Sequence, residues 1–236
     1  MRGKSWGRTG IVALAALMLT GCGGGAPADD PTPSATRPAS PSATAEPTPA
    51  EPTPTESADP VAEVDEIAIR PTGIELRAGG EVVEVLDYTS PAADAIATLT
   101  EAIGSAPVDE PYEGGFHNPP GVLHTWGGFV LDERFYGDEQ AGSATSPYGV
   151  PSFAVFAEGP TAGELSVSAG QGRRIGDSAA VIDAGYPLGP DQMVCQGTPI
   201  EGVEIDGSIV TVAAYSDDGA TVTWLGAPAM VQDACV

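Results

Sequence analysis

The sequence predicts an α+β domain in which antiparallel sheet carries one packed helix on each of two loosely similar halves, preceded by a disordered stalk. Short apolar segments that nearly alternate with polar residues recur through residues 61–236, a pattern typical of half-buried strands. Two segments with helical spacing each follow such strand signals and precede more of them. This order of elements predicts halves at residues 61–140 and 150–236.

Residues 1–21 have the organisation of an export leader. A short basic start precedes an uncharged apolar run over residues 11–19, which is too short to span the ~30 Å core of a bilayer. The run ends in Leu19-Thr20-Gly21-Cys22, which resembles the lipobox of bacterial lipoproteins. The resemblance implies cleavage before Cys22, transfer of a diacylglyceryl group with its two acyl chains to the Cys22 sulfur, and a lipid anchor on the extracytoplasmic face of the cell membrane. An ordinary cleaved signal peptide with a chance cysteine is the alternative.

The charge balance restricts the partners. The leader holds three of the nine basic residues, so the mature chain would carry six arginines against 33 acidic residues. This excess argues against nucleic acid, whose phosphates would be repelled. We expect the membrane, through Cys22, and an envelope protein or small ligand as partners. We expect no cofactor, because the sequence contains neither a glycine-rich phosphate loop nor a dinucleotide fingerprint.

Residues 22–60 are predicted to form a disordered stalk behind the lipidated cysteine. Pro, Thr, Ala and Ser dominate this segment, and larger aliphatic residues are almost absent. Such a composition cannot bury enough apolar surface to offset the entropy of ordering. With polyproline II geometry at ~3.1 Å per residue, the stalk would reach at most about 120 Å from the membrane.

The strand predictions rest on alternation and on turn residues. The turn Ala78-Gly79-Gly80 separates two strands, Gly127-Gly128 divides another segment, and Ser216-Asp217-Asp218-Gly219 joins the clearest hairpin. The expected strands are residues 74–77, 82–86, 121–131 (one or two strands), 153–156, 164–167, 208–215 and 220–225.

Two helices are predicted between these strands. Ser90 is expected to cap the first, with Pro91 at its first position and Gly104 at its end. The second, shorter helix is expected to run from Asp177 to Gly185. Three apolar residues at spacings of three and four form one face of the first helix: Ile96, Leu99 and Ile103.

The segment Arg174-Ile175-Gly176-Asp177-Ser178-Ala179-Ala180-Val181 resembles the turn-into-helix element of the β-lactamase-inhibitor-protein-like repeat that occurs in several envelope lipoproteins.

Cys195 and Cys235 are an even pair in an exported, oxidising setting, which predicts a disulfide between them. It would close a loop of about 40 residues and stabilise the fold by roughly 3–4 kcal/mol. Two free thiols are the alternative.

One stretch, residues 112–129, combines aromatic residues with Gly and Pro, a composition that suits a binding edge or a long structural loop. A metal site at the two histidines would need Glu113 as a third ligand and matches no recognised spacing, so we predict no metal site. Ordinary hydrogen-bonded turn and strand histidines are the simpler interpretation. The candidate binding residues are Glu113, Phe116, His117, His124, Trp126 and Phe129.

No catalytic residue is predicted, since the sequence has no nucleophile elbow and no recognisable pair of catalytic carboxylates. A lipid-anchored surface domain that binds an envelope protein or small ligand without catalysis is therefore the leading hypothesis. An envelope hydrolase that uses His117 or His124 with nearby carboxylates is the alternative. A purely structural spacer is the third hypothesis, and it predicts that residues 126–129 are buried and that no pocket exists.

Overall fold

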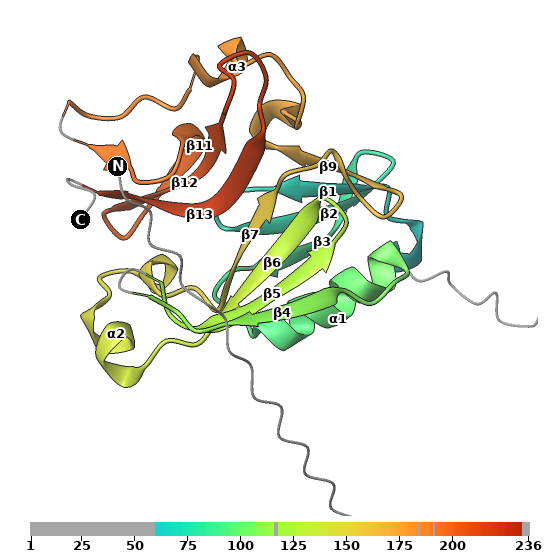
Figure 1. Ribbon diagram of the computed structural model, residues 1–236, viewed down its shortest axis with the longest axis horizontal. Helices are drawn as coiled ribbons and strands as arrows, with labels where there is room; N and C mark the ends of the chain where they lie inside the picture. The colour runs from blue at the N-terminus through green and yellow to red at the C-terminus, as the bar shows by residue number, and fades with distance from the viewer. Residues whose placement is uncertain (1–59, 116–117, 184, 191, 233–236) are drawn as a thin grey trace, which may run out of the picture. The chain divides into compact units, whose positions relative to one another are not determined.

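The computed structural model describes residues 60–115, 118–183, 185–190 and 192–232 (Figure 1). All of them belong to one compact unit, Pro54–Val236. The leader, Cys22 and the stalk to residue 59 lie outside the described residues, so the anchor and the stalk stay predictions. Within the described part of the chain, no helix is both long enough and apolar enough to cross a bilayer.

The first sheet has five strands, and it mixes early and late parts of the chain. Its neighbours pair antiparallel except β1 and β9, which run parallel. In spatial order the strands are β3 (Glu81–Asp87), β2 (Gly73–Ala78), β1 (Glu66–Ile69), β9 (Leu165–Ala169) and β8 (Thr161–Ala162).

The second sheet is larger, and all its strand pairs are antiparallel. The short strand β10 (Met193–Val194) pairs with the end of β13. The other strands, in spatial order, are β11 (Thr198–Ile205), β12 (Ser208–Tyr215), β13 (Trp224–Gln232), β7 (Phe153–Ala157), β6 (Phe129–Arg134), β5 (Gly121–Trp126) and β4 (Val108–Tyr112).

The helices are few. Helix α1 (Ala92–Ile103) ends at Gly104, whose φ of 75° is the left-handed conformation that favours glycine at a helix end. Its N-cap is Pro91 rather than the expected Ser90, and no side chain caps it. The remaining helices are short: α2 (Asp138–Ser143), α3 (Ala180–Asp183) and the 3-10 turns η1 (Pro60–Glu63), η2 (Pro147–Gly149) and η3 (Gly170–Gly172).

The broad expectation of antiparallel sheets is confirmed, and most predicted strands lie where expected. Each sheet, however, takes strands from both predicted halves, because β9 pairs with β1 and β7 lies between β6 and β13. The second predicted helix is reduced to the four residues of α3. One helix packed on each of two similar halves therefore stays a prediction.

The two sheets share one hydrophobic core. Tyr88, directly after β3, is fully buried, and its ring packs edge-to-face on Phe153 of β7 with centroids 5.4 Å apart. The Tyr88 hydroxyl donates to the carbonyl of Arg70 (3.0 Å), and its own carbonyl accepts from the amide of Ser152 (2.9 Å). Burial holds the pKa of the Tyr88 hydroxyl well above its usual value, so it stays a donor. Tyr88 thus ties the end of one sheet to the start of a strand in the other.

Ion pairs reinforce this junction. The guanidinium of Arg70, after β1, contacts the carboxylate of Glu75 on β2 (3.1 Å) and that of Glu201 on β11 (3.0 Å). Glu75 also pairs with Arg77, so the charges alternate along this surface. Of these pairs, Arg70–Glu201 is the one that joins the first sheet to β11.

Candidate functional site

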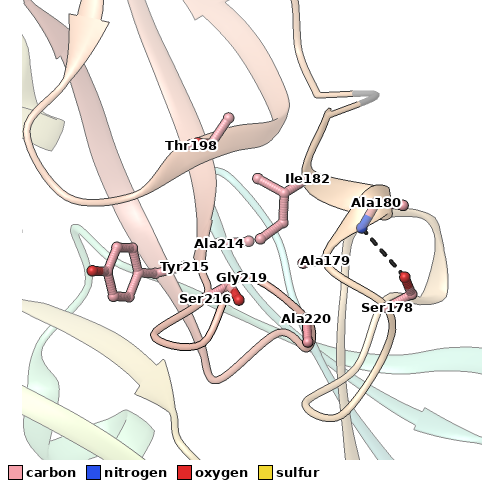
Figure 2. Close-up of a pocket in the computed structure, with 10 residues that line it drawn as sticks. All are labelled: Ser178, Ala179, Ala180, Ile182, Thr198, Ala214, Tyr215, Ser216, Gly219 and Ala220. Atoms are coloured by element: carbon pink, nitrogen blue, oxygen red, sulfur yellow. Dashed lines mark hydrogen bonds between the residues drawn. The ribbon is translucent and has the colours of Figure 1, made fainter.

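A cavity of about 540 Å³ lies at one end of the second sheet, between α3, the start of β11 and the turn that follows β12 (Figure 2). This volume lies within the range of sites for small molecules. The lining residues are small or neutral: Ser178, Ala179, Ala180, Ile182, Thr198, Ala214, Tyr215, Ser216, Gly219 and Ala220.

Backbone hydrogen bonds join the two walls of the cavity. The amide of Ala179 donates to the carbonyl of Ala220 (2.8 Å), and the amide of Gly176 donates to the carbonyl of Val222 (2.9 Å). The amide of Val222 donates in return to the carbonyl of Asp177 (2.8 Å). The segment before α3 is therefore fixed to the turn by a short ladder, and the cavity is the space left beyond it.

Two side chains hold α3 in place. The hydroxyl of Ser178 accepts from the amide of Ala180 (3.4 Å) at the beginning of the helix, as the dashed line in Figure 2 shows. The guanidinium of Arg173 donates to the carbonyl of Val181 within the helix. A four-residue helix has little stability by itself, so these contacts and the ladder keep this wall ordered.

The opposite wall is a turn organised by Asp218. Its carboxylate accepts from the amides of Ala220 (2.8 Å) and Thr221 (2.9 Å) and from the hydroxyl of Ser216 (3.1 Å). The two backbone hydrogen bonds are the main reason that the pKa of Asp218 is lowered to about 2. The first strand of the predicted hairpin is confirmed as β12. The second strand was expected at residues 220–225, but β13 begins only at Trp224, because the turn around Asp218 is wider than expected.

This lowered pKa gives a testable pH dependence. Since the folded pKa of Asp218 lies below its ordinary value of 3.8, the stabilisation from the charged carboxylate is complete above about pH 5 and is lost as the pH falls towards 2. We expect wild-type protein to lose more unfolding free energy over this interval than Asp218→Asn, measured by urea unfolding at each pH. Glu204→Gln, at an exposed position on β11, is the control for loss of one negative charge. Parallel pH profiles for wild type and Asp218→Asn would contradict the prediction.

The cavity is electrically neutral in a very acidic protein. None of the described residues that line it carries a charge, although the chain has a net charge of −24. The Asp218 carboxylate bonds within its own turn, and that of Asp217 accepts from the hydroxyl of Thr223 (2.9 Å). The arrangement can accept a neutral ligand, with the hydroxyls of Ser178 and Thr198 as hydrogen-bond partners.

Four of the binding residues expected from the sequence are among the described residues (Glu113, His124, Trp126 and Phe129), and none of these lines the cavity. Trp126 and Phe129 are buried in the core, with 3% and 0% exposure, so they offer no contact surface, and we correct the expectation for this pair. The indole of Trp126 donates to the carbonyl of Ser105 (2.9 Å), a structural hydrogen bond. Glu113 is exposed in the loop after β4. The remaining two, Phe116 and His117, lie outside the described residues.

His124 is only 7% exposed and lies between two carboxylates. Its Nδ1 lies 2.8 Å from Asp109 on β4, and its Nε2 lies 3.3 Å from Glu133 on β6. Both ring nitrogens therefore face carboxylates of the neighbouring strands. No group of three His, Cys, Asp or Glu residues suited to a metal ion is present in the described parts of the chain.

A second polar network crosses the same strands. The hydroxyl of Tyr112 donates to Asp132 (2.6 Å), whose other carboxylate oxygen accepts from the guanidinium of Arg134 (2.7 Å). Burial, followed by the neighbouring Asp132, raises the pKa of Tyr112 above its usual value. These residues fasten the edge strand β4 to β6, and their interactions are internal.

The structure describes only one of the two cysteines of the predicted disulfide. Cys195 is disulfide-bonded, whereas Cys235 lies outside the described residues. Their pairing therefore stays a prediction.

No family model matches this chain, and neither a curated protein nor a solved structure matches it. The resemblances of residues 19–22 and 174–181 to known families consequently rest on those residues alone.

Proposed function

We propose that the protein is a non-enzymatic binding domain, held by a lipid on Cys22 at the extracytoplasmic face of the cell membrane and raised from it by the stalk. Its ligand is a small neutral molecule of the envelope, and nucleic acid is not a partner. The observation that carries the proposal is the neutral cavity of about 540 Å³ between α3 and the turn after β12.

The geometry favours binding over the alternatives. An envelope hydrolase based on His124 would need a free ring nitrogen, and both nitrogens face carboxylates at 2.8 and 3.3 Å. His117 lies outside the described residues, so a hydrolase based on it stays a prediction. A purely structural spacer agrees with the buried Trp126 and Phe129 but leaves the cavity without a role.

Filling the cavity tests this function. Ala180 is an exposed residue at the start of α3 that lines the cavity, and Ala141 is an exposed alanine in α2, away from it. The low-molecular-mass neutral fraction of an envelope extract is the probe, and the melting temperature is the measurement. We expect this fraction to raise the melting temperature of wild type and of Ala141→Trp, because a ligand that binds only the folded state stabilises it. Ala180→Trp should show a clearly smaller increase.

Two results would contradict the proposal. One is a melting temperature of the wild type that no neutral fraction changes. The other is an increase that Ala180→Trp retains in full, because the ligand would then bind outside the cavity. Circular dichroism of Ala180→Trp without ligand checks that the variant is folded.

A further inference from the structure

Three aromatic residues lie on the face of the second sheet that points away from the shared core. Tyr215 of β12 pairs directly with Trp224 of β13, and Phe156 of β7 pairs with Gly226, two residues after Trp224. Residues opposite each other, and residues two apart on one strand, share a face of the sheet. Their sequence neighbours on the other face are buried in the core: Val155, Ala214 and Leu225.

The indole of Trp224 lies flat on its own strand. A Cβ atom on Gly226 would come within 2.2 Å of the Trp224 ring, so the ring occupies the space that a side chain at this position would take. The rings of Trp224 and Phe156 are 6.4 Å apart and inclined by only 23°. Glycine weakens a strand interior and commonly marks a close approach of another group. Here Gly226 leaves the space that the indole of Trp224 occupies over the strand.

The three rings form a surface that we call the aromatic platform (Phe156, Trp224 and Tyr215). Phe156 and Trp224 are partly exposed, and Tyr215 is 51% exposed. Because neighbouring strands are about 4.8 Å apart, the platform extends across roughly 10 Å of the sheet. Its residues carry no formal charge, in contrast to the acidic protein around it.

Ring faces exposed in this way stack with ligands that have a flat apolar side. Nucleobases are one such class, but the net charge of −24 repels the phosphates that accompany them. Proline-rich peptides dock in grooves between aromatic walls, whereas a flat indole with a nearly parallel neighbour provides a plane. Neutral sugars have an apolar C–H face and polar edges, which suits a plane without charges.

We propose that the aromatic platform binds a neutral oligosaccharide chain by stacking of consecutive sugar rings. This site is separate from the cavity beside α3, although Tyr215 borders both. In Figure 2 the ring of Tyr215 points away from Ala179 and Ala180, and Tyr215 pairs with Trp224 of the platform on the neighbouring strand. The backbone of the same strand, through Ala214 and Ser216, continues along the cavity.

The test is a titration of the full-length protein in detergent with neutral gluco-, manno-, galacto- and N-acetylchito-oligosaccharides, followed by calorimetry and by tryptophan emission. We expect one of these series to bind and to change the emission of Trp224, since Trp126 is buried. Loss of one stacking ring should weaken binding about two- to tenfold in Tyr215→Ala. Trp224→Phe, which keeps a smaller ring, should weaken it as well. Phe135→Ala removes a similarly exposed aromatic (50%) outside the platform and should bind like wild type.

The outcomes separate this site from the cavity. Ala180→Trp should bind the oligosaccharide normally if the platform is the site, whatever its effect on the cavity ligand. The proposal is overturned if no neutral oligosaccharide binds, if Tyr215→Ala and Trp224→Phe both bind like wild type, or if only nucleotides or proline-rich peptides bind. Circular dichroism of the variants confirms that any loss of binding comes from folded protein.

Discussion

Replacement of Tyr88 by alanine should lower the free energy of unfolding by about 3–5 kcal/mol, the range for removal of a fully buried aromatic side chain. The ring is completely buried, packs edge-to-face on Phe153 and connects the two sheets. Its loss would leave a cavity at the junction and remove the hydroxyl that donates to the carbonyl of Arg70. Urea unfolding of the purified domain measures the effect as a lower midpoint with an unchanged slope.

Two control variants divide this effect into its parts. Tyr88→Phe keeps the ring and loses only the hydrogen bond, so a cost of about 1–2 kcal/mol is expected. Thr89→Ala changes the exposed neighbour and tests whether this segment is generally sensitive. A loss below about 1 kcal/mol in Tyr88→Ala would mean that this residue does not hold the sheets together.

Replacement of Cys22 by alanine should abolish lipid attachment completely. If residues 19–22 act as a lipobox, the wild-type protein incorporates labelled palmitate, partitions into a detergent phase and has a mature N-terminus at Cys22. Two acyl chains at about 0.8 kcal/mol per buried methylene hold a protein on the membrane essentially permanently. Cys22→Ala should carry no label and should retain its leader, which mass spectrometry of the intact protein detects.

Thr89→Ala is the control, because it changes an exposed residue of the domain and should still be labelled. A wild-type protein that is found in the medium with an unmodified N-terminus would refute the anchor. It would leave the cavity and the aromatic platform untouched as binding sites, since both are formed by the folded domain alone.

Local signals predicted much of the secondary structure. Gly127-Gly128 divides β5 from β6, and Gly79-Gly80 divides β2 from β3, because glycine adopts the turn conformations at both places. Helix α1 was predicted by its spacing and its terminal glycine. The edge strand β4 was missed because all its residues are partly or fully exposed, so no alternation marks it.

The order of the strands in the two sheets could not be predicted from local sequence patterns. Neither the parallel pairing of β1 with β9 nor the position of β7 beside β13 leaves a signal in a short window of sequence. The division into two halves followed chain order, and the sheets do not.

The candidate site was missed for a different reason. Its lining is mostly Ala, Ser and Gly, residue types that are common on any surface and indicate no chemistry alone. The aromatic residues of the expected binding edge were misassigned because Trp126 and Phe129 are directly opposed across a two-residue turn. Their alternation with Thr125 and Val130 places them on the core side of the sheet.

The parallel pair β1–β9 joins residues about a hundred positions apart, with Glu66 opposite Ser166. If the chain leaves the cell through a secretion channel with its N-terminus first, β1 emerges long before its partner has been delivered. The first sheet cannot close until β9, which ends at Ala169, has been delivered. Contacts of such long range also slow folding, because the entropy of closing the intervening loop must be overcome first.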